Sequence, residues 1–579
     1  MPKTFFITTA IDYTNSPPHI GHAYEKVLAD VIARYHRLKG DNVFFLTGVD
    51  QHGQKVQQSA AKAGVPPAEF VKEITQKFVD LWKKLDVQYD EWAETTSERH
   101  KKVVQGILQR LFDAGQIYKD KQAGYYSVRQ EQFLTDKERG PDGQFGPEWG
   151  QVEFREEENY YFKLSDHKKW LRDYLEKRDD AVIPDFRKTE LRNAVEKLSG
   201  DLCISRPKTR LDWGIELPFD KDFVNYVWFD ALTNYISFAG YDPNAGAVAT
   251  GLRPVATDRG SESLGTAHRA VATSEYDAQS QEFRDRWPAL QIIGKDILVP
   301  AHGIYWLIML HAIGFQDDHM PQLLVHGWWN LGGAKMSKSA GNVIDPFALY
   351  EKYGAEALRY YLMSEIATGG DSDFSEERLV VRYNADLANS LGNLLNRSLT
   401  MAAKYQVSLI AFPKAEAPEN PDEGAMASYA AAIAKEIKSY ISHMSPGRAF
   451  PITFPITLGP FMVNAAIKNV LEVVSQGNVL VENEAPWKLA KAGDEASRKR
   501  LNSVLYSLAE TLRIAAILIS PVLPRAAQGI FDQLNWKMEL SGNEERFSLA
   551  DAEWGRLPDG HVVGKGVPLF PRIDVGDGV

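Results

Sequence analysis

KTFFITTAIDYTNSPPHIGHAYEKVLADVIARYHRLKGDNVFFLTGVDQHG, residues 3–53, is the stretch that decides the fold of this chain. Residues 3–10 are apolar and β-branched, which predicts a short buried strand. Apolar residues recur at helical spacing over residues 23–38, and residues 42–48 form a second apolar run. A strand, a helix and a strand in this order form a βαβ unit. We therefore expect an α/β fold with a Rossmann-type parallel sheet that binds ligands at the carboxyl ends of its strands.

The tetrapeptide His19-Ile20-Gly21-His22 lies between the first predicted strand and the predicted helix. A helix start offers unpaired backbone N–H groups and the positive end of the helix dipole, both suited to phosphate oxygens. Gly21 lets a ligand approach the backbone, and two imidazoles can donate hydrogen bonds to phosphate. Alone, the motif is equally compatible with capping or core histidines.

A second motif, Lys335-Met336-Ser337-Lys338-Ser339, lies in a loop that contains Gly332, Gly333 and Gly341. Two lysines on a glycine-flanked loop can close over a triphosphate, although most lysine pairs are solvated turns. Finding both motifs in this order, each beside the predicted sheet, favours a nucleotide site over coincidence.

Composition limits the class of protein. Of 579 residues, 44% are hydrophobic and 25% charged, which is typical of a globular protein with a large core, and the length suggests about four structural units. The single cysteine, Cys203, excludes an internal disulfide and a cysteine-rich zinc ribbon. The net charge of −11 excludes a general nucleic-acid-binding field, so any RNA must meet a local surface. No signal peptide is visible, and the apolar stretch 512–523 is too short to span a bilayer, so we expect a cytoplasmic protein.

The rest of the chain divides by pattern. Strand-like pieces and charge runs over residues 118–207 predict a domain inserted in the sheet, and helical periodicity dominates from residue 374. Two stretches are anomalous: a polar insertion at 243–282 and a duplicated Phe-Pro-Ile-Thr at 450–457. We expect these divisions: the first half of the catalytic domain at 1–117, an inserted connective domain at 118–207, the second half at 208–334, the lysine loop with its following segment at 335–373, an all-helical bundle at 374–540 and a tail at 541–579.

Six segments together resemble the class I aminoacyl-tRNA synthetases, and among them the methionyl-tRNA synthetases, over nearly the whole chain. They are residues 8–22, FFLTGVDQHG (44–53), ISRPK (204–208), YVWFDA (226–231), GKDI (294–297) and KMSKS (335–339). The resemblance implies that L-methionine and ATP, with Mg²⁺, form methionyl-adenylate, and that the methionyl group passes to the 3′ end of tRNA(Met), the initiator tRNA included. It assigns the catalytic and ATP-binding roles to His19, Gly21, His22, Lys335, Ser337 and Lys338.

The resemblance also implies a methionine pocket. Methionine carries a polarizable thioether that packs well on aromatic faces. Asp50 matches the carboxylate that anchors the substrate's ammonium group, and Arg206 with Asp296 matches a polar pair near the active centre. Core packing explains any one of the pocket aromatics, so only the set is informative. The matching positions are Ala10, Ile11, Tyr13, Asp50, Trp228, Ala231, Leu232, Tyr235, His302 and Trp306.

One spacing departs from the family. His302 follows Gly294 by one residue more than expected, so we expect a bulge near Val299-Pro300-Ala301 that also affects the assignment of Trp306.

The predicted helical bundle resembles the family's anticodon-binding domain. Asn389, Asn393 and Arg397 recur every four residues, which places them on one helical face, and Trp487 matches an aromatic on which an anticodon base stacks. Without the resemblance, a polar helix surface and a core tryptophan would be the favoured interpretation.

Many relatives carry cysteine-based zinc knuckles in the connective domain. Residues 118–200 contain no cysteine, so a Cys₄ site is impossible there and we expect no metal. The given sequence ends soon after residue 572, so we expect no appended dimerisation domain and a monomer.

Three alternatives remain open. A nucleotidyltransferase with the same first motif would not need the helical bundle. A synthetase for leucine, isoleucine, valine or cysteine would lack the pocket set from Trp228 to Tyr235. A non-catalytic tRNA-binding paralogue would have degraded motifs, whereas both motifs are intact here.

Overall fold

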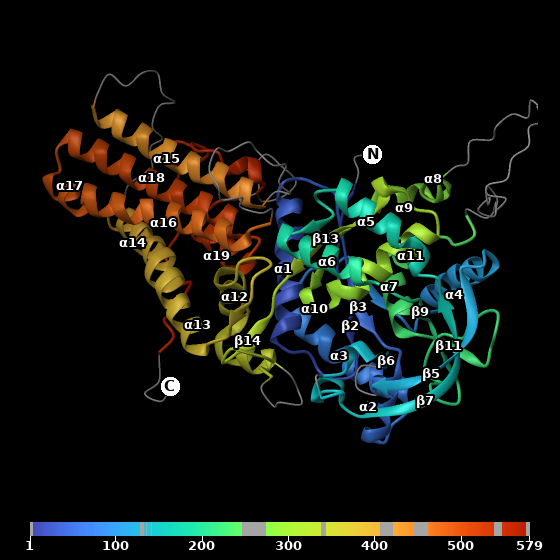
Figure 1. Ribbon diagram of the computed structural model, residues 1–579. Coiled ribbons are helices and arrows are strands. Elements are labelled where there is room, and N and C mark those ends of the chain that lie inside the picture. The colour runs from blue at the N-terminus through green and yellow to red at the C-terminus, as the bar shows by residue number, and fades with distance from the viewer. Residues whose placement is uncertain are drawn as a thin grey trace, which may run out of the picture. The chain divides into compact units, whose positions relative to one another are not determined.

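The computed structural model describes residues 4–127, 132–134, 136–140, 142–245, 274–336, 343–405, 421–444, 461–537 and 547–574 (Figure 1). The chain forms two compact units. The first unit consists of Met1–Pro17, Leu46–Val79 and Asp90–Leu324, and the second unit consists of Pro18–Phe45, Asp80–Tyr89 and Val325–Val579. The predicted domain boundaries do not follow this division, because residues 18–45 of the predicted catalytic half belong to the second unit.

A seven-stranded sheet organises the first unit. Its order is β2-β3-β1-β12-β13-β8, with β4 paired to β3, and the pairs β1–β12, β2–β3, β3–β4 and β13–β8 are parallel. Strands β1 and β12 are almost wholly buried, which explains why both read as continuous apolar runs. The predicted α/β class is confirmed. The strands are β1 (Phe5–Thr9), β2 (Asp12–Tyr13), β3 (Val43–Asp50), β4 (Glu91–Glu94), β8 (Val182–Ile183), β12 (Leu290–Gly294) and β13 (Gln322–His326).

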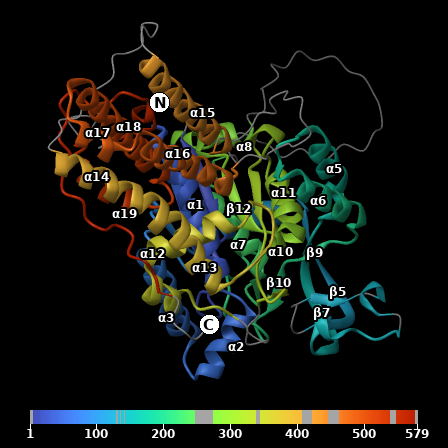
Figure 2. The ribbon, with the colours of Figure 1, turned by 90° about the vertical axis from the view of Figure 1, so that its left-hand side faces the viewer.

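The predicted connective segment forms a second, antiparallel sheet in the order β6-β5-β7-β9. Its two long strands pair along their whole length and are drawn as a curved ribbon in Figures 1 and 2. The same segment also contributes β8 to the main sheet, so it is not a separate layer throughout. Its elements are β5 (Ile117–Ser127), β6 (Gln132–Leu134), β7 (Val152–Phe162), α5 (Lys168–Lys177), α6 (Asp185–Lys197) and β9 (Leu202–Cys203).

Further elements complete the first unit, and some of them line the site described below. They are α2 (Gln54–Ala63), α4 (Glu98–Asp113), β10 (Ser205–Pro207), β11 (Phe223–Asn225), α7 (Val227–Ser237), α8 (Glu275–Ala278), α9 (Gln281–Arg286), α10 (Lys295–Ile297), a π-helix over Leu298–Trp306 and α11 (Leu307–Ala312). Helix α3 (Pro67–Lys84) begins in this unit and ends in the second.

The predicted insertion at 243–282 is described only at its two ends. Gln279 bonds to Asp242 through both its amide atoms, so the two ends lie together. The buried carboxylate of Glu275, on α8, accepts hydrogen bonds from Arg110 at 2.9 Å and from Tyr241 at 2.7 Å. Residues 274–282 are thus part of the folded unit, and residues 246–273 lie outside the described residues.

The second unit contains the predicted first helix, which begins earlier than expected, as α1 (Ile20–Leu38). Arg359 is fully buried beside it on α12 (Pro346–Glu365) and donates to Asp30 at 2.7 Å, to Leu85 O and to the carbonyls of Pro521 and Val522. A small sheet in the order β15-β14-β16 follows the main sheet in sequence. Its strands are β14 (Trp329–Leu331), β15 (Ala334–Lys335) and β16 (Ser372–Asp373).

The helical bundle completes the second unit (yellow to red in Figure 1). Its helices are α13 (Glu376–Arg382), a π-helix over Tyr383–Gly392, α14 (Asn393–Tyr405), α15 (Pro421–Met444), α16 (Val463–Glu484), α17 (Pro486–Ala492), α18 (Glu495–Ile519) and α19 (Pro524–Gln533). The duplicated Phe-Pro-Ile-Thr falls outside the described residues.

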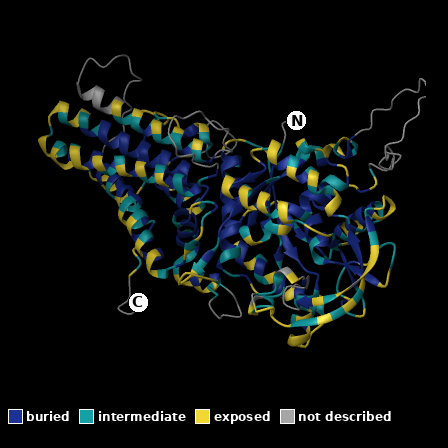
Figure 3. Ribbon diagram, in the orientation of Figure 1, coloured by how far each residue is buried: buried dark blue, intermediate teal, exposed yellow. Residues whose placement is uncertain are grey.

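Helix α18 forms the centre of this bundle, as the dark blue inner faces in Figure 3 show. Among the described residues it is the one helix long and apolar enough to cross a membrane, yet 94% of its apolar window is buried, as in the core helix of a soluble protein. The predicted tail is folded where it is described: Leu557 N donates to Glu510 and Ile573 N donates to Asn384.

Candidate active site

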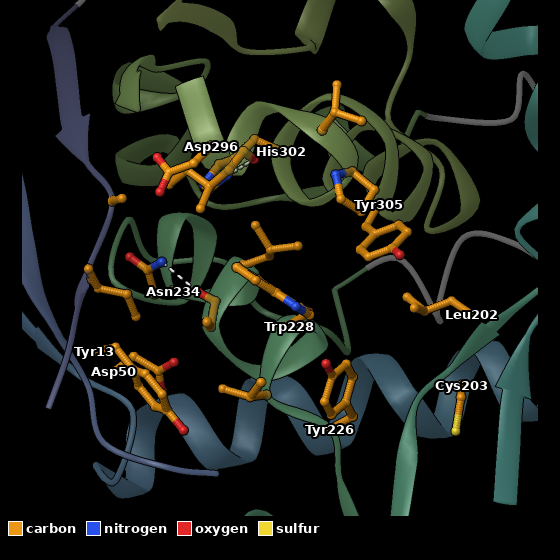
Figure 4. A pocket seen from close by; sticks show the side chains of 18 of the residues that line it. Tyr13, Asp50, Leu202, Cys203, Tyr226, Trp228, Asn234, Asp296, His302 and Tyr305 are labelled. Carbon is orange, nitrogen blue, oxygen red and sulfur yellow. Dashed lines mark hydrogen bonds between the residues drawn. The ribbon is translucent and has the colours of Figure 1, made fainter. Parts of the chain in front are cut away.

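A cavity of about 700 Å³ opens in the first unit where parallel strands end (Figure 4). Ala10 and Ile11 follow β1, Asp50 is the last residue of β3, and Asp296 follows β12. The carboxyl edge of a parallel sheet is where ligands of α/β proteins bind. The cavity is therefore at the position that the βαβ pattern predicts.

Helix α7 forms a second wall of the cavity. It presents Trp228, Ala231, Leu232, Asn234 and Tyr235 to the space, and Figure 4 shows the Trp228 ring in the middle of the view. This mixture of aromatic and small apolar side chains suits an unbranched apolar ligand.

A glycine sets the position of Tyr13. Gly53 has φ +107°, and a Cβ on it would lie 2.6 Å from the Tyr13 hydroxyl oxygen. Only glycine adopts that backbone conformation at little cost and leaves room for the hydroxyl group. Gly53 therefore allows Tyr13 to lie close to the end of β3.

Tyr235 and His302 form a buried pair in the cavity wall. The Tyr235 hydroxyl lies 2.7 Å from His302 Nε2, and His302 Nδ1 lies 3.0 Å from the carbonyl oxygen of Ile297. A carbonyl only accepts, so in the neutral imidazole Nδ1 carries the proton and Nε2 accepts from the tyrosine. The pair is thus fixed in one donor and acceptor arrangement before any ligand binds.

Asp50 is 5% exposed and held by local hydrogen bonds. Its main-chain oxygen accepts from both the N–H and the hydroxyl group of Thr14, and its Oδ1 lies 3.3 Å from the N–H of His52. A buried carboxylate at the wall of a cavity is a suitable partner for the ammonium group of a ligand, because a buried ammonium group needs a negatively charged or hydrogen-bonding partner.

A buried network supports the wall formed by α7. Asp230 accepts from His52 at 2.7 Å and from His100 at 2.8 Å, and His100 contacts the Ser237 hydroxyl at 2.8 Å. Burial by itself raises the pKa of a carboxyl group, but the two histidines overcome this and hold the pKa of Asp230 below its ordinary value. The network connects α7 to the end of β3 and to α4.

Eleven of the residues predicted for the pocket and its polar support line this cavity, and one does not. Trp306 is buried behind it, with Nε1 donating to Gln291 at 3.0 Å and its ring 5.7 Å from that of Tyr235. Tyr305 lines the cavity instead. The expected irregularity is present as well: Val299 has an extended backbone conformation within the π-helix, which breaks the helical phase before Trp306. The lining residues that were predicted are Ala10, Ile11, Tyr13, Asp50, Arg206, Trp228, Ala231, Leu232, Tyr235, Asp296 and His302.

Arg206 is 4% exposed and lies over the ring of Tyr226 at 4.3 Å. Its guanidinium donates to Ser205 O at 2.7 Å and to Cys203 Sγ at 3.1 Å. The sequence did not indicate Tyr226, Cys203 or Asn234 as cavity residues. Tyr226 and Asn234 lie next to predicted positions in the same segment and could have been found from them. No pattern in the sequence indicated that Cys203, on β9 of the connective sheet, would line the cavity. The further lining residues are Lys55, Trp149, Tyr161, Asp201, Leu202, Val227, Ile297, Val299 and Pro300.

The second unit contains the histidine motif at the start of α1. His19 is the N-cap: its Nδ1 accepts from Gly21 N at 3.1 Å, and His22 Nδ1 accepts from His19 N at 3.0 Å. The two rings stack with centroids 3.8 Å apart. Because both Nδ1 atoms accept, each neutral imidazole is the tautomer with its proton on Nε2, beside the helix start.

Gly21 is required by the ring of His19. A Cβ on Gly21 would lie 2.9 Å from His19 Cε1 and 3.1 Å from its Nδ1. The glycine therefore allows the capping arrangement as well as a close approach of a ligand.

The lysine motif is described only in part. Lys335, on β15, is exposed and its Nζ lies 3.8 Å from the centre of the Trp328 ring. Ser337 and Lys338 lie outside the described residues. The segment that begins at residue 343 contacts the histidine motif, because Ile20 N donates to Ile344 O at 3.2 Å.

No cluster of three or more histidine, cysteine or acidic side chains suited to a metal ion occurs in the described part of the chain. Residues 128–131 of the connective segment fall outside it, so the expectation of no zinc stays a prediction.

The predicted anticodon residues are on the surface of the bundle. Asn389 and Asn393 are exposed, and Arg397 is half-buried with its guanidinium 2.8 Å from Glu482. Asn389 belongs to the π-helix and the other two to α14, so the four-residue spacing crosses a change of helix type. Trp487, on α17, is 43% exposed, which excludes the interpretation as a core tryptophan.

The sequence of the chain identifies its class. The family model described as tRNA synthetases class I (M) matches residues 5–143 and 149–399. The chain therefore belongs to the class I tRNA synthetases of this M group.

Several similar proteins are methionine–tRNA ligases. The methionine–tRNA ligase of Lactococcus lactis is 37% identical over 583 residues, which cover 99% of this chain and 78% of that protein. The methionine–tRNA ligase of Caldanaerobacter subterraneus is 38% identical over 578 residues, covering 99% and 80%. The solved structure of Mycobacterium tuberculosis methionyl-tRNA synthetase in complex with methionyl-adenylate has a TM-score of 0.81 at 34% identity and covers 98% of this chain and all of that one.

Proposed function

We propose that this chain is a methionine–tRNA ligase. It activates L-methionine with ATP, forming methionyl-adenylate and diphosphate, and transfers the methionyl group to the 3′ end of tRNA(Met), including the initiator tRNA. The observation that carries this proposal is the cavity at the carboxyl ends of β1, β3 and β12, with a buried carboxylate and aromatic walls. It occurs in a chain related over almost its full length to methionine–tRNA ligases.

In the proposed complex, methionine occupies the cavity of the first unit. Asp50 pairs with the α-ammonium group, and the aromatic and small apolar side chains surround the thioether. Arg206 and Asp296 support the polar end. Trp306 acts only through Tyr235, whose ring it contacts.

ATP is proposed to be held by residues of the second unit. The Nε2–H groups of His19 and His22, together with the start of α1, donate to phosphate oxygens. Lys335, Ser337 and Lys338 bind the phosphates from the loop, and Mg²⁺ accompanies ATP as part of the substrate. The methionine carboxylate then attacks the α-phosphorus, and the charge that grows on the departing diphosphate is stabilised by the two lysines.

The bundle is proposed to bind the tRNA anticodon. Asn389, Asn393 and Arg397 would read bases, and the exposed ring of Trp487 would stack on one. We further propose a monomer that works in the cytoplasm without zinc, with the domain boundaries given from the sequence.

The test is the amino-acid-dependent exchange of labelled diphosphate into ATP. Its rate is measured with each of the twenty amino acids in turn. Methionine should give the highest rate, because an unbranched apolar side chain packs best against the aromatic rings around Trp228. A higher rate with another amino acid would overturn the assignment of the cavity. Exchange with none of them would overturn the assignment as a ligase.

A further inference from the structure

Glu25 and His326 form a buried ion pair to which the proposed function gives no role. Glu25 belongs to α1, about one helical turn after His22, and is 7% exposed. His326 is the last residue of β13 and is 6% exposed. Its Nε2 lies 3.0 Å from Glu25 Oε2, and 301 positions of the chain separate the two residues. Both belong to the second unit, so the pair joins two distant segments of that unit.

The hydrogen bonds of this pair fix its protonation. His326 Nδ1 lies 2.7 Å from the carbonyl oxygen of Gly327, which only accepts. The ammonium group of Lys26, fully buried, donates to Glu25 Oε1 at 2.9 Å. Burial by itself raises the pKa of the Glu25 carboxyl group, but Lys26 and His326 overcome this and hold the pKa below its ordinary value. The carboxylate is thus ionised, so both ring nitrogens of His326 donate and the ring is an imidazolium.

Stability alone does not explain a buried ion pair at this place. Removing two charges from water costs free energy that offsets much of their attraction, so well-packed apolar side chains would hold α1 against β13 at least as firmly. Charge-assisted hydrogen bonds, however, are directional, because each donor must meet its acceptor. The pair therefore points to a requirement for one defined position of the chain after β13.

His326 leads directly into the hairpin that carries Lys335. Strand β14 begins soon after it, at Trp329, and Asn330 of β14 pairs with Lys335 of β15. Trp329 is 3% exposed, and its ring meets the Tyr24 ring of α1 edge-on with centres 6.2 Å apart. The base of the hairpin is therefore held against α1 by the ion pair and by this aromatic contact.

Close packing also fixes the segment between β13 and β14. A Cβ on Gly327 would overlap the carbonyl oxygen of Gly370, and Trp328 N donates to Asp371 Oδ1 at 2.9 Å. The Trp328 ring in turn contacts Lys335, whose Nζ lies 3.8 Å from the ring centre. A displacement of the ion pair would therefore move the segment on which Lys335 depends for its position.

We propose that His326 is a positioning residue of the proposed reaction: through Glu25 it holds the hairpin of Lys335 at a fixed place relative to the histidine motif on α1. This inference rests on the proposed function, in which both motifs bind the phosphates of ATP. Two motifs from distant parts of the chain can act on one triphosphate only when their spacing is set. His326 itself contacts no substrate in this proposal.

The test compares two amides at position 326 by single-turnover adenylate formation. The amide nitrogen of glutamine can take the place of Nε2 and donate to Glu25, whereas that of asparagine can take only the place of Nδ1. His326→Asn should lower the plateau rate about tenfold, and His326→Gln should keep it within about threefold of the wild type. The methionine Kd, measured by calorimetry without ATP, should stay within about twofold in both variants, because the cavity lies in the first unit.

Glu25→Gln tests the same pair from α1. The change removes the negative charge that Lys26 and His326 both face, so it weakens the connection from the other side. The plateau rate should again fall about tenfold while the methionine Kd is preserved. A plateau rate equal to that of the wild type would contradict the inference.

His36→Asn is the matched control. His36 also belongs to α1, is 3% exposed and contacts a carboxylate, with Nδ1 2.7 Å from Asp41 Oδ2. It lies in the last turn of the helix, whereas the histidine motif lies at the start. Its replacement should leave the plateau rate and the methionine Kd within about twofold, even where the melting temperature falls. The comparison separates a positional effect from a general loss of stability.

An unchanged plateau rate in folded His326→Asn would overturn the inference. Equal losses in His326→Asn and His326→Gln would also overturn it, because the bond to Glu25 would then not matter. A methionine Kd that rises as much as the rate falls would do the same, because the pair would then support the fold as a whole. These three results leave the proposed function standing, whereas a wild-type chain without methionine-dependent diphosphate exchange would overturn that function and this inference with it.

Discussion

The cavity of the first unit and the functional surfaces of the second unit are built differently. Tyr235 and His302 are 1% and 3% exposed and already bonded to each other, whereas Trp487 is 43% exposed and Lys335 lies on the surface. Buried groups have their geometry fixed by the fold, and exposed groups gain most of their partners only when a ligand arrives. Substitutions in the two units should therefore change different measured quantities.

The largest effect is expected for Lys338→Ala in the second unit. The lysine is proposed to act on the charge that develops on diphosphate, so the rate of adenylate formation should fall about 10²–10³-fold while the methionine Kd stays the same. Single-turnover kinetics and calorimetry measure the two quantities. Lys565→Ala, an exposed lysine of the C-terminal segment, is the control and should leave both unchanged. An equal loss in methionine binding would contradict the division of roles.

Tyr235→Phe should weaken methionine binding and leave the rate of adenylate formation unchanged. The change removes the hydroxyl that donates to His302 Nε2 at 2.7 Å, so the cavity wall loses one fixed contact. The methionine Kd should rise about 5–10-fold, as expected for one buried hydrogen bond, and the maximal rate of adenylate formation should be preserved. A lower maximal rate with an unchanged Kd would show that the pair acts on the reaction itself.

Trp487→Ala should affect tRNA alone. Loss of base stacking should lower the efficiency of tRNA charging about 5–10-fold and leave methionine-dependent diphosphate exchange and the melting temperature unchanged. Val479→Ala removes a side chain that is 51% exposed on α16 and should change none of the three. If exchange falls together with charging, Trp487 supports the fold of the second unit instead.

The smallest effect is expected in the first unit, for replacement of residues 246–273 by a short glycine-serine linker. The two ends are held together by Asp242 and Gln279 and anchored by Arg110 through Glu275. The rate of exchange should stay within about twofold of the wild type. A loss of exchange in the linker variant would give the insertion a role in the reaction.

Arg110→Ala, by contrast, should lower the melting temperature, because it leaves the buried Glu275 carboxylate without its ion pair.

The βαβ pattern predicted the location of the site at the carboxyl ends of the strands. The family resemblance assigned Ala10, Asp50 and Asp296 to the site, and all three line the cavity because parallel strands end at one edge of the sheet. It did not predict that Tyr305 would replace Trp306 at the cavity. That outcome depends on the extended conformation of Val299, and helical periodicity does not hold across such a break.

Long-range associations were also missed. Strand β8, from the predicted inserted domain, pairs with β13 of the main sheet, and α1 belongs to the second unit. Both depend on contacts between distant segments, which local patterns do not record.

The most direct test of the division between the two units is the single-turnover rate of adenylate formation measured against methionine concentration. One curve gives both the half-saturating concentration and the plateau rate. Tyr235→Phe should raise the first and preserve the second, and Lys338→Ala should lower the second and preserve the first. If both variants change the same parameter, methionine recognition and catalysis are not carried by separate groups and the account fails.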